Sequence, residues 1–494
     1  MAKKKMKKWV AVVLSIVAVL VVLVAIIAIK TATFTSKQVA AGKQPTFAID
    51  ADKVAERLSG ALKFKTISNI DYEKFDYSQF TGLQEYIEKS FPLVHSTLEK
   101  KVINNYALLY IWKGSDPSLN PILLLGHQDV VPVAAEGWQH EPFSGDIAGG
   151  YIWGRGTLDD KGCIFNIMEA AEYLIKDGFK PARSIYFAFG HDEEIGGMQG
   201  AKKIGEYLKS QNLQFEFAID EGMLITKGSV PGVKQPAALI GTAEKGYLSL
   251  ELIADGTGGH ASMPPKQTAV GVLAAAVDKL EMNPFPIRMT GPASGLFEYL
   301  GPEMSFPYNM LFANMWLFGP VVQSQLAASN ATNATIRTST APTMFQGSSQ
   351  DNVLPTKAVA VVNFRILPGE SVKSTQDRVV QVVNDPRVKV QPMDRGSSEP
   401  SPISPTDTWS YRTLNKTIRE VMPDVLIAPM LVLAGTDCEH YEALCPNIYR
   451  FLPQRLYGDD TGMIHGTNEK IAISNYVEGI SYYIQLMKNM CGGS

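Results

Sequence analysis

The chain has 494 residues, of which 45% are hydrophobic and 19% are charged, and its formal net charge is −3. This is the composition of a globular protein long enough for two or three domains. A nearly neutral chain without a basic stripe beyond its first residues is not expected to bind nucleic acid. The four cysteines form no CxxC pair and no dense cluster, which argues against both a disulfide framework and a thiolate metal site.

The N-terminus differs in composition from the rest of the chain. Five lysines fall within residues 1–8, and residues 9–29 then contain no charge and a single polar side chain, Ser15. A helix of that length crosses a hydrocarbon layer of about 30 Å, and flanking lysines stay on the cytoplasmic side. A cleavable signal peptide would need small residues where the chain has Lys30. We therefore predict a cytoplasmic segment at 1–8, an uncleaved transmembrane anchor at 9–29, a linker at 30–48, and an extracytoplasmic or lumenal remainder.

The segment from 49 to 244 alternates between buried strands and amphipathic helices, a pattern typical of an α/β domain with a mostly parallel sheet. Asp50 is a capping residue at the start of the first predicted helix. The other predicted elements are strands at 107–112, 121–125, 184–189 and 215–219 and helices at 82–89, 163–176 and 200–210.

The pattern changes near Lys245. Strands at 248–254 and 359–364 and helices at 267–280 and 371–383 surround a long stretch rich in aromatic residues and Met. The α/β pattern returns from about residue 400 and ends in a helix near 471–488. We therefore expect a catalytic domain built from 49–244 and 397–494, with an inserted α+β domain at 245–396 that acts as a lid or in dimerisation.

Side chains that bind metals recur where the predicted strands end. The segments are Gly126-His-Gln-Asp129, 153–162, Gly190-His-Asp-Glu-Glu-Ile-Gly-Gly197, Ile219-Asp-Glu-Gly222 and Gly462-Met-Ile-His-Gly466. Open α/β sheets hold ligands just beyond the carboxyl ends of their strands. Imidazole and carboxylate ligands without thiolates suit zinc, and several carboxylates suit two metals that share one of them. Each segment alone is more typical of a solvated acidic turn, but their recurrence in one α/β chain predicts a dinuclear metal site.

These motifs, in this order, resemble the dinuclear zinc exopeptidases and aminoacylases related to carboxypeptidase S and glutamate carboxypeptidase. The branch of carboxypeptidase S and the N-acyl-amino-acid hydrolases is the most similar. The resemblance runs from about Ile49 to the C-terminus. It implies two Zn²⁺ per subunit, with Co²⁺ or Mn²⁺ as alternatives. It also implies hydrolysis of the amide bond next to a free C-terminal carboxylate, in short peptides or in N-acyl amino acids.

The resemblance assigns the metal ligands residue by residue. His127 and Asp220 would hold one zinc, and Asp129 would orient the ring of His127. Asp159 would bridge both metals, with a cis peptide bond to Asp160. Glu194 and His465 would complete the second metal site.

Glu193 would then be free to act as the general base, since adjacent glutamates can divide the roles of base and ligand. Asp160 and Glu221 are interpreted as supporting or capping groups.

Residues of the inserted segment are implied on the substrate side. His260, in Gly258-Gly-His-Ala-Ser-Met-Pro-Pro265, would stabilise the oxyanion. Arg365 would grip the substrate carboxylate with Asn352 beside it, because a guanidinium pairs with a carboxylate in a bidentate way. Gly435 and Thr436, in Ala434-Gly-Thr-Asp437, would close on the same carboxylate.

Several alternatives stay open at this point. The aromatic stretch between Phe297 and Phe345 is either ordinary core or an apolar wall for an acyl chain. The chain is a monomer or a homodimer, and its main role is either that of a carboxypeptidase or that of an N-fatty-acyl-amino-acid hydrolase/synthase. A metal-free, membrane-anchored binding protein on the same fold is a further alternative, which the complete set of ligand positions argues against.

Overall fold

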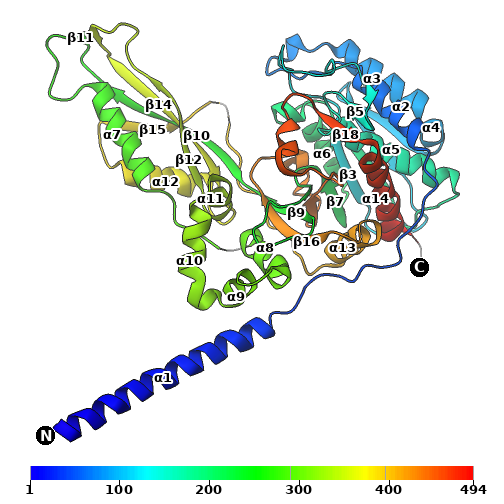
Figure 1. Ribbon diagram of the computed structural model, residues 1–494. Helices are drawn as coiled ribbons and strands as arrows, with labels where there is room; N and C mark the ends of the chain where they lie inside the picture. Colours follow the sequence, from blue (N-terminus) through cyan, green and yellow to red (C-terminus); the bar gives the residue numbers. More distant parts are fainter. Residues whose placement is uncertain (1, 290, 395, 493–494) are drawn as a thin grey trace.

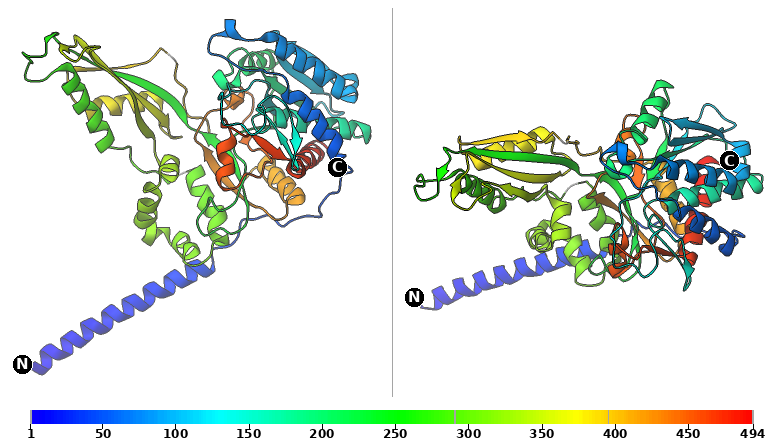
Figure 2. Two further views of the ribbon diagram at one scale, coloured as in Figure 1. Left: turned by 45° about the horizontal axis from the view of Figure 1, so that its top comes forward. Right: turned by 90° about the horizontal axis from the view of Figure 1, so that it is seen from above.

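The fold is built around two β-sheets, one mixed and one antiparallel, and the N-terminal helix projects away from both (Figures 1 and 2). The computed structural model describes residues 2–289, 291–394 and 396–492. One sheet lies inside an α/β body and the other forms an elongated arm beside it. Strand β9 (Ala237–Glu244) of the body leads directly into β10 (Gly246–Asp255) of the arm, with only Lys245 between them.

The sheet of the body has nine strands in the order β1-β2-β6-β3-β7-β17-β9-β16, with β8 attached to β9. The strands besides β9 are β1 (Glu99–Ile103), β2 (Ala107–Trp112), β3 (Ile122–His127), β6 (Ile185–Gly190), β7 (Phe217–Asp220), β8 (Ile225–Thr226), β16 (Leu426–Val432) and β17 (Ile448–Arg450). The run β6-β3-β7-β17 is parallel, as is the pair β9-β16. The pairs β1-β2, β2-β6, β8-β9 and β9-β17 are antiparallel.

The sheet is therefore mixed, and the prediction of a mostly parallel sheet is wrong for these four antiparallel pairs. At the β1 edge of the sheet, the antiparallel direction follows from the turn between β1 and β2. Asn104 and Asn105 both have positive φ, of 47° and 73°, which is the backbone of a tight hairpin turn. A turn this short joins only antiparallel strands.

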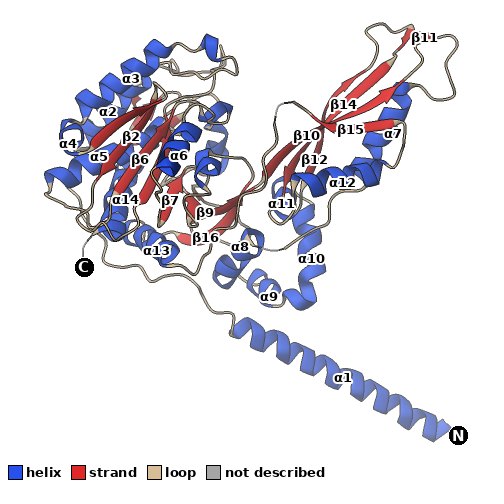
Figure 3. Cartoon of the chain, turned by 180° about the vertical axis from the view of Figure 1, so that it is seen from behind, coloured by secondary structure: helices blue, strands red, loops and turns tan. Residues whose placement is uncertain are grey.

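Helices cover both faces of this sheet (Figure 3). One face carries α2 (Ala51–Leu62), α3 (Tyr77–Ser90), α4 (Pro92–Thr97), α5 (Lys161–Lys176), α13 (Trp409–Val421) and α14 (Ile473–Cys491). The other face carries α6 (Ala201–Ser210) and the 3-10 helix η4 (Asp437–Tyr441). The predicted cap is present, since Asp50 accepts a hydrogen bond from the backbone N–H of Lys53 at the start of α2.

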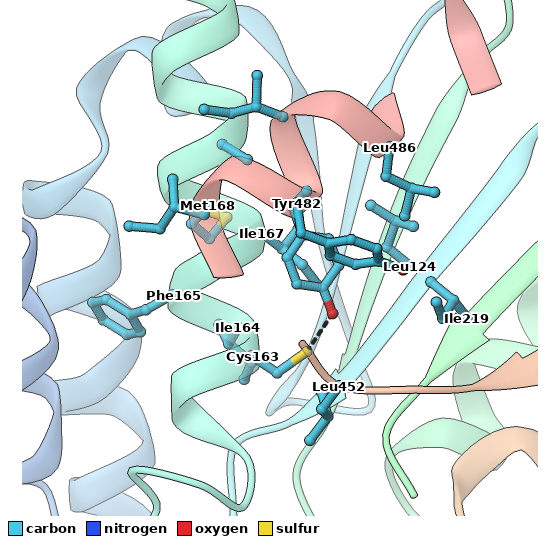
Figure 4. Packing of buried hydrophobic residues seen from close by; sticks show 14 of the residues in the cluster. Leu124, Cys163, Ile164, Phe165, Ile167, Met168, Ile219, Leu452, Tyr482 and Leu486 are labelled. Carbon is cyan, nitrogen blue, oxygen red and sulfur yellow. Dashed lines mark hydrogen bonds between the residues drawn. The ribbon is translucent and has the colours of Figure 1, made fainter. Parts of the chain in front are cut away.

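The core beneath α5 is densely packed (Figure 4). Ile164 and Ile167 of α5, Tyr482 of α14 and Leu124 of β3 are fully buried against one another. Burial of each such side chain contributes about 1.5–3 kcal/mol. This packing holds α5 rigidly, and with it the loop 154–160 that precedes the helix.

The arm is an antiparallel sheet in the order β12-β14-β10-β15. Its elements besides β10 are β12 (Ser339–Gln346), β14 (Lys357–Ile366), β15 (Val388–Pro392), α7 (Ala269–Met282) and α12 (Val372–Val383). Alternate residues of β10, including Leu248 and Leu250, are buried beneath α7 and α12. A small ladder of β11 (Gly259–His260) and β13 (Val353–Leu354) forms the tip farthest from the body (Figure 1).

The aromatic stretch of the inserted segment is mostly helical. It forms α8 (Pro292–Leu300), η3 (Gly301–Glu303), α9 (Tyr308–Ala313), α10 (Met315–Ala327) and α11 (Asn330–Ile336). The N-terminal helix α1 (Ala2–Ala32) ends beside α9. Residues 8–32 of α1 are long and apolar enough to cross a membrane by length and composition, and none of the helix tested is buried.

The remaining short elements lie near the body. A three-stranded sheet contains β4 (Ile147–Ala148), β5 (Tyr151–Trp153) and β18 (Lys470–Ala472). Three further 3-10 helices are η1 (Tyr72–Lys74), η2 (Glu193–Ile195) and η5 (Gly458–Met463).

Candidate active site

The carboxyl ends of three parallel strands bring the predicted ligand segments together. His127, the last residue of β3, lies opposite Gly190, the last residue of β6. β7 pairs with the other side of β3 and ends at Asp220. The residues that follow these strands therefore meet at one edge of the sheet, as expected for a ligand site of an α/β fold.

The ring of His127 is buried and held from one side by Asp129. Its Nδ1 lies 3.0 Å from the carbonyl oxygen of Asp129 and 3.3 Å from the Oδ1 of the same residue. Nδ1 thus carries the proton that it donates to these oxygens, and Nε2 is left as the metal-ligand nitrogen. The Asp129 carboxylate also accepts the backbone N–H groups of Glu193 at 3.1 Å and Glu194 at 3.2 Å. One carboxylate therefore orients the ring and the Glu-Glu turn together.

Asp159 lies between two histidines. Its Oδ1 is 2.9 Å from Nε2 of His127, and its Oδ2 is 3.0 Å from Nε2 of His465. His465 also lies 3.1 Å from Oε2 of Glu194. The peptide bond between Asp159 and Asp160 is cis, as the resemblance implied. A carboxylate whose two oxygens face two imidazoles is placed to be shared between two metal ions.

At the end of β7 the structure differs from the predicted ligand set, because Glu221 rather than Asp220 faces the cluster. Oε1 of Glu221 lies 3.4 Å from Nε2 of His127. The carboxylate of Asp220 turns away, accepting the backbone N–H of Glu221 at 3.0 Å and the thiol of Cys438 at 3.4 Å. Successive side chains of a strand point to opposite sides, so only one of these adjacent acids can face the metals. In this structure Glu221, which was interpreted as a supporting or capping group, takes the position predicted for Asp220 beside His127.

Burial and crowding set the electrostatics of the cluster. Burial, reinforced by the charge of Glu221, raises the pKa of Glu193 well above its usual value. Burial and the charge of Asp159 raise the pKa of Glu221 to about 8. Burial opposes ionisation of Asp159 too, but the neighbouring imidazoles of His127 and His465 lower its pKa.

These carboxylates fit divalent cations. Three groups of imidazole and carboxylate atoms each lie within 4.8 Å of one another. Oε1 of Glu194 is buried and has no hydrogen-bond partner in the described part of the chain, as expected for an atom that faces a metal. A divalent cation would relieve the mutual repulsion of these acids. The donor set, free of thiolates, suits zinc, cobalt or manganese.

The cluster opens into a cleft of about 690 Å³ that also contains predicted substrate residues. Arg365, Gly435 and Thr436 line it together with Glu193 and His465. The Arg365 guanidinium lies over the ring of Tyr247, 4.9 Å from its centre, and both residues line the cleft. Apolar walls come from the body, namely Leu158, Met223, Leu224, Val432, Leu452 and Ile464. No residue of 285–349 is among the described lining residues, so the aromatic stretch does not form the wall of this cleft.

His260 and Asn352 do not reach the cleft in this arrangement. Both lie at the tip of the arm, where the backbone N–H of Ala261 donates to the carbonyl oxygen of Asn352 at 2.9 Å. The His260 ring is exposed, with Nδ1 2.8 Å from Oγ of Ser262. The predictions that His260 reaches the oxyanion at the metals and that Asn352 lies beside Arg365 at the substrate carboxylate are therefore not met here. The physical cause is the orientation of the arm, which the sequence pattern does not encode.

A buried ion pair missing from the sequence analysis ties the two halves of the site together. Nη1 of Arg155 lies 2.6 Å from Oε2 of Glu469. Oε1 of Glu469 accepts the backbone N–H groups of Leu158 at 2.7 Å and Asp159 at 3.3 Å. Nη2 of Arg155 donates to the carbonyl oxygen of His465 at 3.1 Å. The sequence offers one indication of this pair, an Arg within the motif 153–162. The motif predicts a loop there but does not identify Glu469 as the partner of the Arg.

We expect Glu469→Gln to lower both activity and metal affinity by about 10–100-fold, as is typical when a group that orients metal ligands is lost. Titration of metal into the chelated protein would measure the affinity, and kcat/KM the activity. The matched control is Glu478→Gln, because Glu478 also pairs with an arginine, Arg455, at 2.6 Å but lies outside the cluster. Equal effects of the two substitutions would show that Glu469 has no positioning role.

The fold and this cluster define a class of protein: a metallohydrolase with an α/β body, ligands at its strand ends, and an antiparallel arm. Residues 123–489 match the model of peptidase family M20/M25/M40. The chain belongs to this family and is an enzyme of its hydrolase type, in agreement with the resemblance drawn from the motifs.

Relatives match over most of their length. The chain is 43% identical over 472 residues to "Probable carboxypeptidase S-like 2" of Dictyostelium discoideum, covering 93% of this chain and 91% of the relative. It is 42% identical over 441 residues to "N-fatty-acyl-amino acid synthase/hydrolase PM20D1" of Xenopus tropicalis, covering 88% and 86%. The crystal structure of the M20 family metallo-carboxypeptidase Sso-CP2 from Sulfolobus solfataricus shares the fold, with a TM-score of 0.63 at 17% identity over 89% of this chain and 99% of that chain.

Proposed function

We propose that the protein is a membrane-anchored dizinc hydrolase that cleaves the amide bond next to a free α-carboxylate, with its body on the extracytoplasmic or lumenal side. The observation that carries the proposal is the placement of Asp159 between His127 and His465, in the cleft that also contains Arg365. Cations at one end and a guanidinium at the other select a substrate with an amide carbonyl and a carboxylate a short distance apart.

His127 and Glu221 would hold one ion, Glu194 and His465 the other, and Asp159 both. When bound, the two ions polarise the scissile carbonyl and make water a nucleophile at neutral pH. They are most simply zinc, given the donor set.

The chain's own residues then bind the substrate and move the proton. Arg365 pairs with the substrate carboxylate, and the loop at Gly435 and Thr436 lies beside it. Glu193, whose carboxylate faces the cluster without being needed as a ligand, takes the proton of the attacking water and gives it to the leaving nitrogen. His260 is the proposed donor to the oxyanion. It reaches the cleft only if the arm rotates over its own body or a second copy supplies the arm, so the active form is a closed monomer or a homodimer.

Two substrate types fit, and an observation supports each. A carboxypeptidase acting on short peptides is supported by the carboxylate-binding end of the cleft and by the carboxypeptidase S-like relative. An N-fatty-acyl-amino-acid hydrolase, running as a synthase when amine and fatty acid are abundant, is supported by the apolar wall that includes Leu158, Leu224 and Val432 and by the PM20D1 relative.

Hydrolysis of benzyloxycarbonyl-Gly-Leu and of N-oleoyl-Phe by the full-length protein in detergent would test the proposal. We expect cleavage that a zinc chelator lowers by at least about 100-fold and that added Zn²⁺ restores, since the ions supply the nucleophile. A higher kcat/KM for the dipeptide would identify a carboxypeptidase, and a higher value for the oleoyl substrate a fatty-acyl hydrolase. No chelator-sensitive cleavage of either would contradict the proposal and favour a binding protein.

A further inference from the structure

An uncharged and partly exposed segment follows η3. Residues 304–336 contain no Asp, Glu, Lys, Arg or His, and they form α9, α10 and α11. Large apolar side chains of this segment face outward. We call the set Phe306, Tyr308, Trp316, Leu317 and Val321 the α9–α10 patch; its members are 75%, 38%, 53%, 37% and 55% exposed. Apolar side chains gathered on a surface in this way mark a contact with a partner or a membrane.

The location of the segment indicates that the membrane, rather than a protein partner, is the surface in contact with the patch. The side-chain amide of Asn314, between α9 and α10, donates to the carbonyl oxygen of Ile27 at 3.3 Å and to Oγ1 of Thr31 at 3.2 Å. Ile27 lies within the charge-free run of α1, about one turn before Lys30 ends it. Asn314, which contacts Ile27, therefore lies at the depth where α1 passes from the hydrocarbon layer to the lipid headgroups. The views place α9 beside this end of α1, and α10 leads from α9 toward the arm (Figures 1 and 2).

Two further features are typical of protein surfaces at the boundary between hydrocarbon and headgroups. A hollow of about 300 Å³ beside the contact is lined mainly by apolar side chains, including Phe34, Phe297, Phe312 and Met315. The patch itself contains Trp and Tyr, the residues enriched where protein meets the membrane surface. The absence of charge over 33 consecutive residues favours contact with a membrane surface over an ordinary water-facing surface.

We propose that the α9–α10 patch lies in the headgroup region of the bilayer that α1 crosses, as a second membrane contact. Trp316 and Tyr308 sit at the interface, and Phe306, Leu317 and Val321 enter the acyl boundary. The proposal rests on α1 as a membrane span but not on the chemistry of the cleft. It would hold the base of the arm against the lipid surface, which restricts how the arm moves relative to the body.

Quenching by lipid-attached nitroxide would test the contact. The four native cysteines are all buried, so an environment-sensitive fluorophore can be attached to full-length Val321→Cys in phosphatidylcholine proteoliposomes. The matched control is Val380→Cys, because Val380 of α12 is also a helical valine, 52% exposed, and α12 lies beyond α10 from α1 (Figure 1). We expect emission at position 321 to fall at least about twofold with nitroxide at the acyl boundary and emission at position 380 to stay unchanged.

Resistance to alkaline carbonate extraction reports separately on α1. Extraction of the protein from the vesicles would overturn the proposed anchor, and with it the basis of the docking. Retention of the protein with equal quenching at positions 321 and 380 would overturn the docking alone. A blue-shifted but unquenched label at position 321 would show that a second copy covers the patch, which also overturns it. Phe306→Cys gives an independent second position, and an unchanged thermal unfolding midpoint verifies that each variant is folded.

Discussion

Glu193→Gln is expected to lower kcat by about 10²–10⁴-fold, the usual contribution of a general acid–base, while both metal ions remain bound. The amide keeps the shape of the side chain but cannot accept the proton of the attacking water. The backbone of residue 193 is held by Asp129 through a bond to its N–H, so the turn should keep its conformation. Steady-state hydrolysis together with elemental analysis of the purified protein would measure both quantities.

Glu194→Gln is the matched comparison, because the two glutamates are adjacent on the same 3-10 turn and hydrogen-bond to the same aspartate. Glu194 contacts His465 at 3.1 Å, so its substitution should release one ion as well as activity. A Glu193→Gln protein that has lost an ion would assign Glu193 to the ligand set and leave the base to be found elsewhere. Retained metal with unchanged kcat would remove Glu193 from the mechanism.

The body could be predicted where burial dominates the sequence pattern. β2 was predicted at its observed bounds because 107–112 is a continuous apolar run that is buried throughout. β9 was not predicted, since its sequence AALIGTAE is dominated by small residues that carry neither a helical nor an alternating period. The prediction of parallel strands is correct for the run β6-β3-β7-β17 and for the pair β9-β16 at one edge, but not for the other pairs. Direction depends on how strands connect and pair, as the hairpin between β1 and β2 illustrates.

The site could be predicted in outline because strand-end residues converge wherever the strands are parallel neighbours. His127, Asp159, Glu194 and His465 were named from the motifs, and the structure brings them within contact. The Arg155–Glu469 pair could not be found in this way, because its partners are 314 positions apart and Glu469 lies outside the strand-end segments. The place of His260 depends on the orientation of the arm as a whole, which short-range patterns do not determine.

Either Asp220 or Glu221 is the metal ligand beside His127, and side chains alternate along a strand. A shift of the end of β7 by one residue would therefore exchange the two acids. We expect Glu221→Gln to lower kcat/KM by more than the roughly 10–100-fold typical of a supporting group and to weaken binding of the ion next to His127. Asp220→Asn should retain both ions and most activity. Its main effect should be a loss of about 1–3 kcal/mol of stability, because it disturbs a buried hydrogen bond with Cys438.

Metal titration, hydrolysis and thermal unfolding of the two variants would separate these outcomes. The pair is its own control, since both substitutions replace an acid by its amide at adjacent positions where β7 ends. Loss of an ion from Asp220→Asn, with Glu221→Gln fully loaded, would restore Asp220 as the ligand and require the end of β7 to turn by one residue. We expect instead that Glu221→Gln loses the ion and Asp220→Asn keeps it. Glu221 contacts His127 at 3.4 Å, whereas Asp220 contacts a thiol on the far side of the strand.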